Sequence, residues 1–191
     1  MRSEGLLLVI SGPAGAGKGT VCSRLLNELD NIEFSTSMTT REPRGTEKNG
    51  VDYFFVSRDE FERAISEGRF IEFAEVYGNY YGTLKDEVAK RLDSGTDVLL
   101  DIDVQGAMNV MRECTDGLFI FIKPPSMEEL RKRLTNRGTD APDVIEKRLG
   151  QAESEMALAH KYDYQVVNYD RDRTVGEVKE IIAKIKGGKT I

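Results

Sequence analysis

A glycine-rich segment ending in a lysine, residues 11–20 (SGPAGAGKGT), has the residue types and spacing that bind phosphate. Its glycines let the backbone curl so that N–H groups point inward with no Cβ in the way, which makes a nest for anions. The helix expected after the loop adds the positive end of its dipole, and Lys18 adds a mobile cation. A strand, a GxxxxGK loop and a helix in this order predict a triphosphate site. Its expected ligands are Gly12, Pro13, Ala14, Gly15, Ala16, Gly17, Lys18, Gly19 and Thr20.

One position departs from the usual pattern of such loops. Gly19 stands where Ser or Thr normally ligates Mg²⁺, and Thr20 comes one residue later. Because Mg²⁺ dehydrates reluctantly and keeps several waters, we expect an ion held mainly by phosphates and water. Whether the protein ligates it directly or only through water stays open at this stage.

Two carboxylates follow the apolar run 97–100, at Asp101 and Asp103. Residues two apart on a strand share a face, and ligands of open parallel sheets bind at the carboxyl edge. We expect Asp101 to act on Mg²⁺ through water and Asp103 to face the phosphoryl acceptor, although the two roles could be exchanged. The alternative for Asp101 is a structural role in holding the phosphate loop.

The segment 35–53 combines hydroxyls with two arginines, Arg41 and Arg44, and ends at Tyr53. Guanidinium groups bind phosphate oxygens in pairs, so these residues and Tyr81 suit a phosphate monoester. Alone, two arginines in a polar loop would indicate a solvated surface. The triphosphate loop upstream favours a phosphoryl acceptor, because a donor site needs an acceptor held to face it.

Composition limits the classes of protein that fit. A chain of 191 residues, 39% hydrophobic and 31% charged, can build one sizeable core with a small insertion. Its net charge of −6 argues against a general affinity for nucleic acid or membrane lipid. No apolar run is long enough for a signal peptide or a membrane span, which predicts a cytoplasmic location. Cys22 and Cys114 are expected to be reduced, and the lone His160 argues against histidine catalysis.

The order of elements predicts an α/β fold. Short apolar runs at 6–10, 97–100, 118–122 and 164–167 alternate with helical patterns, as in a parallel sheet covered by helices, the P-loop NTPase type. Ser126 with Glu129 reads as a capping box, and Pro142 suits a first helical turn. The helices are predicted at 18–29, 84–94, 105–113, 127–136, 143–161 and 175–186.

Two segments interrupt this alternation. Residues 34–83 are predicted to form an inserted binding subdomain of small antiparallel strands with one helix at 58–67. The polar stretch 136–142 is predicted to be a mobile flap. A single domain of 1–191 is therefore expected, with a core (1–33, 84–135 and 149–191), the subdomain 34–83 and a lid at 136–148.

The run SxSxTTRxPRxxExxGxDY, which begins at Ser35, resembles the monophosphate-binding segment of guanylate kinases. Further matching motifs follow in order: FIEFAEVYGNYYGT at 70–83, LLDIDVQG at 99–106, IKPPS at 122–126, LRKRLTNRGTD at 130–140, EKRL at 146–149 and VVN at 166–168. The resemblance covers essentially the whole chain. It implies phosphorylation of GMP by ATP with Mg²⁺, giving GDP and ADP by direct in-line transfer, in purine nucleotide metabolism and GMP recycling.

The resemblance also implies residue roles. Guanine would be read by Ser37, Glu72 and Asp103, with Thr83 also on the base, because a carboxylate can accept from both N1–H and the exocyclic amine of guanine. Arg133, Arg137 and Arg148 would close over the triphosphate, and the subdomain and flap would close by a hinge. Catalysis would rest on Lys18, Arg41 and these three arginines. GMP binding would rest on Ser37, Arg41, Arg44, Tyr53, Glu72, Tyr81, Thr83 and Asp103, and Asn168 would join the phosphate loop in binding ATP.

Several alternatives remain open from the sequence. The chain could be a non-catalytic relative that binds phosphorylated peptides through the same arginines, although intact Lys18 argues against this. It could also be a kinase of another monophosphate, since GKGT occurs in adenylate kinases too. Tyr169 stands where the family often has an acid, which leaves the adenine pocket undetermined. Neither the use of dGMP nor the choice between monomer and homo-oligomer can be deduced.

Overall fold

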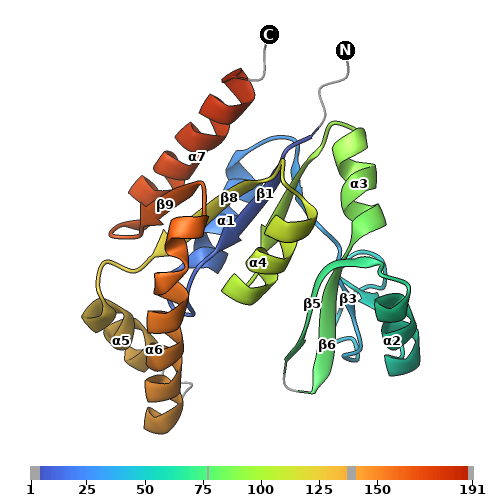
Figure 1. Ribbon diagram of the computed structural model, residues 1–191, viewed down its shortest axis with the longest axis horizontal. Coiled ribbons are helices and arrows are strands. Elements are labelled where there is room, and N and C mark those ends of the chain that lie inside the picture. The colour runs from blue at the N-terminus through green and yellow to red at the C-terminus, as the bar shows by residue number, and fades with distance from the viewer. Residues whose placement is uncertain (1–4, 77, 137–140, 189–191) are drawn as a thin grey trace. The chain divides into compact units, whose positions relative to one another are not determined.

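A computed structural model describes residues 5–76, 78–136 and 141–188 and has an α/β fold (Figure 1). Five strands form one sheet in the order β2-β7-β1-β8-β9. Its pairs β1–β8, β2–β7 and β8–β9 are parallel, which confirms the predicted fold class. The strands are β1 (Leu7–Ser11), β2 (Ile32–Phe34), β7 (Asp97–Asp101), β8 (Leu118–Lys123) and β9 (Tyr164–Val167).

Strand β2 was not predicted. It is short and pairs with β7 along the register Ile32 to Asp97 and Phe34 to Leu99. Only Ile32 is buried, whereas Glu33 and Phe34 are exposed, so the strand carries no continuous apolar run. Its pairing with β7, rather than its own side chains, makes it a strand.

The helices largely follow the predicted ranges. The main differences are at α6, which ends before a short 3-10 helix (Ala159–Lys161), and at α7, which begins four residues earlier than predicted. Asp170 explains the early start, because its carboxylate accepts a hydrogen bond from the backbone N–H of Arg173 at 3.0 Å. The helices are α1 (Lys18–Glu28), α2 (Arg58–Ser66), α3 (Lys85–Asp93), α4 (Val104–Glu113), α5 (Met127–Asn136), α6 (Pro142–Ala157) and α7 (Arg171–Gly188).

The chain divides into two compact units, which are described separately. The first comprises Met1–Leu7, Asn31–Leu100 and Gln105–Gly117, and the second comprises Leu8–Asp30, Asp101–Val104 and Leu118–Ile191. The predicted division into core, subdomain and lid stays a prediction.

The first unit contains a second sheet of four strands in the order β4-β3-β6-β5. Strand β6 (Asn79–Leu84) pairs antiparallel with both β5 (Phe70–Val76) and β3 (Met38–Thr39). The pair of β3 with β4 (Phe54–Phe55) is parallel, so this small sheet is mixed, as the predicted fold class has it, and not antiparallel throughout. The chain between β3 and β4 is a long polar loop, which lets the second strand return in the same direction.

Helix α2 covers this small sheet through one aromatic cluster (Figure 1). The ring of Phe61 is fully buried and stacks on Phe70 at 4.4 Å and on Tyr80 at 5.1 Å between centroids. Ser57 caps the helix and forms a capping box with Glu60, which fixes where the helix begins. The cluster therefore gives β5 and β6 a rigid backing.

In the second unit, α5 and α6 lie side by side and share an apolar cluster (Figure 1). Leu130, Leu134, Ile145 and Leu149 are its main buried members. The Ser126 hydroxyl accepts from the N–H of Glu129 at 3.1 Å, which confirms the predicted cap of α5, and Pro142 opens α6 as predicted. The two arginine-bearing helices thus pack on each other and not only on the sheet.

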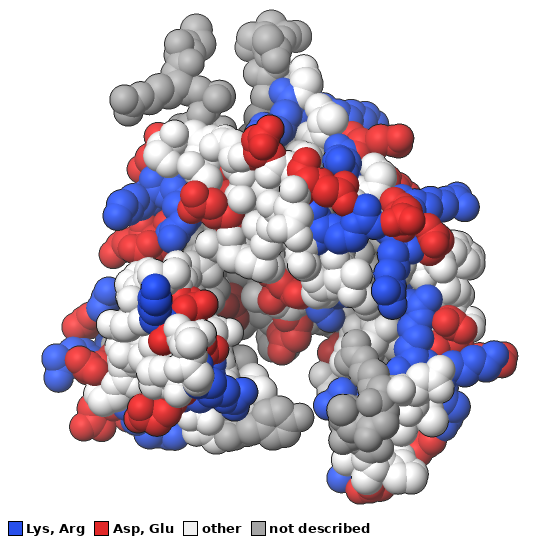
Figure 2. Space-filling view, turned by 180° about the vertical axis from the view of Figure 1, so that it is seen from behind, with Lys and Arg blue, Asp and Glu red and all other residues white. Residues whose placement is uncertain are grey.

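The surface mixes charges of both signs. On the face displayed in Figure 2, lysine and arginine side chains are interleaved with aspartate and glutamate. None of the helices in the described part of the chain is long and apolar enough to cross a membrane.

The aromatic cluster yields a test of this packing. Phe61→Ala should lower the free energy of unfolding by about 3–5 kcal/mol, because it removes a fully buried ring from between two others. Chemical denaturation monitored by circular dichroism measures the change. Phe73→Ala is the matched control, since Phe73 is 42% exposed and its loss should cost far less. Equal losses in the two variants would contradict the assignment of Phe61 as the centre of the cluster.

Candidate functional site: a phosphate loop and an arginine–tyrosine cluster

The phosphate loop joins β1 to α1 through glycines with left-handed backbone. Gly12, Gly15 and Gly17 have φ values of 139°, 89° and 100°. A Cβ on Gly12 would lie 2.2 Å from the carbonyl oxygen of Ile122, so the loop can pass this strand only as glycine. Gly17 is the N-cap of α1, and no side chain caps the helix there. The first N–H groups of α1 are therefore available to an anion.

Asn168 holds the outer side of this loop. Its side-chain amide donates to the carbonyl of Ala16 at 2.7 Å, and the same nitrogen would lie 2.2 Å from a Cβ on Gly17. The Asn168 oxygen accepts from the hydroxyl of Thr174 at 3.0 Å. Asn168 was predicted to bind ATP, and the structure shows its buried side chain bonded to the loop and to α7.

Lys18 folds back over the loop. Its ammonium group donates to the carbonyls of Gly12 and Pro13. Burial lowers the pKa of Lys18, while the nearby carboxylates of Asp101 and Glu155 oppose this shift. The cation is thus held inside the loop by carbonyl groups that a phosphate can replace.

Asp101 borders a cavity at the phosphate loop. The cavity has a volume of about 450 Å³ and is lined by Asp101, Ala14, Gly15 and residues 17–20. The Asp101 carboxyl remains in reach of solvent, yet partial desolvation raises its pKa and Lys18 opposes the rise. An Asp101 oxygen would lie 3.6 Å from a Cβ on Gly19, so the carboxylate faces the position that lacks the usual hydroxyl.

The carboxylate oxygens of Asp101 suit a hard cation such as Mg²⁺. Within the described residues, no group of three or more His, Cys, Asp or Glu forms a metal site by itself. The Asp101 carboxylate beside the loop fits an ion whose other ligands come from phosphates and water. Asp103 lies two residues after Asp101, between β7 and α4, and Thr20 lies in the first turn of α1.

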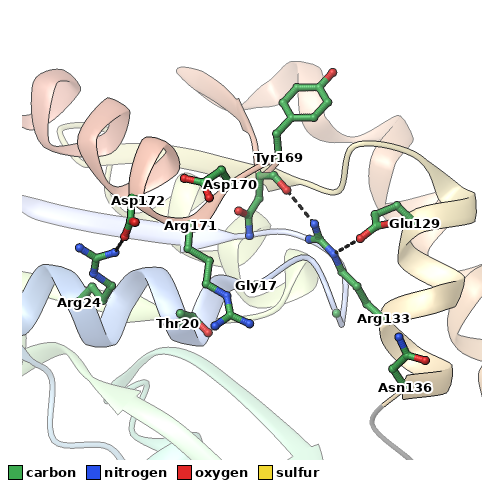
Figure 3. A pocket seen from close by; sticks show the side chains of 12 residues that line it. Gly17, Thr20, Arg24, Glu129, Arg133, Asn136, Tyr169, Asp170, Arg171 and Asp172 are labelled. Carbon is green, nitrogen blue, oxygen red and sulfur yellow. Dashed lines mark hydrogen bonds and ion pairs between the residues drawn. The ribbon is translucent and has the colours of Figure 1, made fainter.

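A larger cavity of about 840 Å³ opens beside the loop (Figure 3). Arg133 reaches into it from α5 and is held by the Glu129 carboxylate at 3.0 Å and the Asn168 carbonyl at 3.0 Å. Arg148 lies on α6, and Arg137 lies outside the described residues. The cavity is lined by Gly15, Gly17, Thr20, Arg24, Glu129, Arg133, Asn136, Asn168, Tyr169, Asp170, Arg171 and Asp172.

The first unit brings together three of the residues predicted to bind a phosphate monoester. The guanidinium of Arg41 lies 5.4 Å from the ring centre of Tyr53, and the rings of Tyr53 and Tyr81 meet edge to face at 6.1 Å. Tyr80 points elsewhere: it stacks on Phe61, and its hydroxyl bonds Arg58. Tyr81 is therefore the tyrosine of this pair that belongs to the cluster, whereas Tyr80 packs on Phe61.

Glu47 organises the cluster and was not among the predicted site residues. Its two carboxylate oxygens accept from the Arg41 guanidinium at 2.9 and 3.0 Å, and one also accepts from the backbone N–H of Arg44 at 2.7 Å. The bond to Arg41, followed by that to Arg44, lowers the pKa of Glu47. The side chain of Arg44 is exposed. Glu47 follows Arg41 by six residues, and this spacing of an acid and an arginine is the sequence signal that could have identified it.

Glu72 and Thr83, two of the residues predicted to read the base, lie on neighbouring strands. The Thr83 hydroxyl donates to the Glu72 carboxylate at 2.6 Å across the β5–β6 pair, next to a register shift between Phe70 and Glu72. Glu72 borders a cavity of about 220 Å³. Ser37 precedes β3, and its carbonyl accepts from the N–H of Phe54 at 2.9 Å. The first unit thus contains all the predicted acceptor residues except Asp103.

Comparison with known proteins gives a consistent family. A family model described as guanylate kinase matches residues 4–185. A guanylate kinase of Caldanaerobacter subterraneus is 50% identical over 95% of this chain and 88% of its own length. One of Lactococcus lactis is 50% identical over 95% and 89%.

Comparison with solved structures also finds a guanylate kinase. The crystal structure of guanylate kinase from Anaplasma phagocytophilum is 40% identical, covers 96% of this chain and 87% of its own, and has a TM-score of 0.72. TT1252 from Thermus thermophilus has a TM-score of 0.53 at 13% identity over 95% of this chain and 98% of its own, which shows a shared fold alone.

The close approach at Gly17 yields a prediction. Gly17→Ala should weaken binding of ATP, the predicted ligand, by about 100-fold or more, since a Cβ there strains the backbone and displaces Asn168 from the loop. Isothermal titration calorimetry measures the affinity. Gly45→Ala is the control, because its φ of 55° is also left-handed but nothing lies within 4 Å of its Cβ. If both variants bind ATP like the unaltered chain, the loop does not depend on this contact.

Proposed function

Because the chain belongs to the guanylate kinase family, we propose that it transfers the γ-phosphoryl group of ATP to the phosphate of GMP, giving ADP and GDP. The observation that carries this proposal is the phosphate loop, with its left-handed glycines and the half-buried Lys18 folded over it. A loop of this kind supports catalysis as well as binding, because the lysine can follow charge toward the transferred group.

On the donor side, the nest and Lys18 hold the outer phosphates. Arg133 and Arg148, with Arg137 from outside the described residues, neutralise the charge that develops during transfer. The hydrogen bonds of Arg133 to Glu129 and to the Asn168 carbonyl support this role, since they point the guanidinium toward the cavity beside the loop.

On the acceptor side, Arg41, Arg44, Tyr53 and Tyr81 bind the phosphate of GMP. The pairing of Arg41 with Glu47 supports this role, because it fixes the guanidinium before the ligand arrives and so lowers the entropy cost of binding.

Guanine selection rests on Glu72, with Ser37, Thr83 and Asp103. Glu72 accepts from N1–H and the exocyclic amine of guanine, and the hydrogen bond from Thr83 holds its carboxylate in one orientation. Adenine has no hydrogen on N1 and no amine at C2, so it would leave the carboxylate unpaired.

The transfer needs no general base. The GMP phosphate is ionised at neutral pH, and one of its oxygens forms a bond to the γ-phosphorus while the bond to the leaving oxygen of ADP breaks. Lys18 and the arginines hold the two reacting groups in line and exclude water, which limits hydrolysis of ATP.

Mg²⁺ is part of this proposal. When bound, it screens the triphosphate charge and orients the phosphate oxygens. Asp101 would hold waters of the ion, and Gly19 leaves room for those waters where a hydroxyl usually stands. We also propose that the reaction takes place in the cytoplasm and that the acceptor subdomain and the lid close during each turnover.

A substrate panel tests the proposal. A coupled assay of ADP formation with ATP and Mg²⁺ should show turnover with GMP and none with AMP, UMP or CMP. Lys18→Ala should lower kcat by about 100-fold or more. Glu72→Gln should raise KM for GMP by about 10- to 100-fold, whereas Glu75→Gln on the same strand should not. Folded protein that binds GMP without any turnover would favour the binding-module alternative.

A second variant tests the role assigned to Glu47. Glu47→Gln should raise KM for GMP by about tenfold and change kcat much less, because an uncharged amide no longer holds the Arg41 guanidinium with two anionic oxygens. Steady-state kinetics with GMP varied at saturating ATP separate the two constants.

Glu42→Gln is the matched control for Glu47, since Arg41 bonds only the backbone carbonyl of Glu42. An unchanged KM for GMP in Glu47→Gln would mean that Arg41 is positioned without this carboxylate. A loss of kcat alone would mean that the pair acts on the transfer step instead of on binding.

A further inference from the structure

The cavity beside the phosphate loop is lined by Arg24, Arg133 and Arg171. Two of them are already paired with carboxylates. Arg24 bonds Glu28 at 2.8 Å and also Asp172, and Arg133 bonds Glu129 at 3.0 Å. Their charges are therefore largely balanced within the protein.

Arg171 differs from these two. Among the described residues, no carboxylate forms an ion pair or hydrogen bond with its guanidinium. The acids on either side of it are committed elsewhere, because Asp170 caps α7 through the N–H of Arg173 and Asp172 bonds Arg24. The first residue of α7 thus places an unbalanced positive charge at the cavity.

A positive charge at this position destabilises the start of α7. A cation in the first turn of a helix is repelled by the positive end of the helix dipole. A residue that is unfavourable for stability at its position and has no compensating partner often binds a ligand.

The side chain of Arg171 points toward the start of α1. Figure 3 shows its guanidinium beside Thr20, with Gly17 next to it, on the side of the cavity opposite Arg133. Thr20 is in the first turn of α1, two residues after Lys18, and is exposed. When the two outer phosphates of a triphosphate lie in the phosphate loop, the next one, the α-phosphate, comes close to Thr20.

We propose that Arg171 binds the α-phosphate of the donor nucleotide, opposite Thr20. A guanidinium can donate two parallel hydrogen bonds to phosphate oxygens, and an exposed threonine hydroxyl can donate a third. This assignment rests on the proposed ATP site, and it adds a donor-binding residue from α7 to the loop and the lid arginines.

Binding measurements test it without requiring turnover. Isothermal titration calorimetry of the full chain should show that Arg171→Ala weakens ATP by about tenfold. The affinity for inorganic tripolyphosphate should fall by a similar factor, because its third phosphate occupies the position of the α-phosphate of ATP. The affinity for pyrophosphate, which fills only the phosphate loop, should change by less than about twofold.

Two further variants serve as controls. Arg173→Ala removes the same charge from the same turn of α7, but Arg173 does not line the cavity, so ATP binding should stay within about twofold. Arg171→Lys should fall between Arg171→Ala and the unaltered chain, because it keeps the charge and loses the fork. Thermal unfolding checks that all variants are folded.

Three outcomes would overturn the proposal. ATP affinity unchanged in Arg171→Ala would show that the side chain does not bind the donor. A loss for ATP with none for tripolyphosphate would show that Arg171 stacks on the base instead. Equal losses in Arg171→Ala and Arg173→Ala would show only a diffuse effect of net charge.

The proposed function and this inference can fail separately. If the unaltered chain binds ATP but phosphorylates no acceptor, the proposed function fails while the effect of Arg171→Ala on ATP binding still decides the inference. If GMP is phosphorylated and Arg171→Ala keeps full ATP affinity, only the inference fails.

Discussion

The rest of the second unit depends on one constraint, the close approach of backbone to backbone that keeps the N–H groups of the phosphate loop turned inward. Gly12 lies so near the Ile122 carbonyl on β8 that no side chain fits between them. Gly15 is similarly close to Leu130 and Leu134 of α5, where a Cβ would meet side-chain carbons at 2.9 and 3.1 Å. The loop is therefore shaped by the strand beneath it and by the helix beside it, and anion binding follows from that shape.

Asn168 connects the loop to the elements that surround it. Its amide bonds the loop at Ala16, its side-chain oxygen bonds Thr174 of α7, and its backbone carbonyl accepts from Arg133 of α5. One buried residue thus joins three elements, and its bonds to Ala16 and Thr174 are buried away from water. A change at Asn168 would affect the loop, α7 and Arg133 together.

The two sites use arginine differently. In the arginine–tyrosine cluster of the first unit, Arg41 is fixed by Glu47 and lies over the rings of Tyr53 and Phe55, so its position is set before a ligand binds. At the cavity beside the phosphate loop, Arg24 and Arg133 are paired with carboxylates whereas no described carboxylate pairs with Arg171. Fixed guanidinium groups give orientation, and an unpaired one adds net attraction for a polyanion.

The sequence alone determined the phosphate loop, the fold class, the family, most helices and four strands of the parallel sheet, because each shows in local spacing or in an ordered motif. It also indicated Arg41, Arg44 and Tyr53 as the residues proposed to bind the acceptor phosphate, since they lie in one contiguous motif. The tertiary structure alone decided the strand β2, the ion pair of Glu47 with Arg41, the hydrogen bond of Asn168 to the loop and the lack of a carboxylate partner for Arg171 within the described residues. These depend on partners distant in the chain or on which carboxylates are already taken, and neither periodicity nor residue type encodes such pairings.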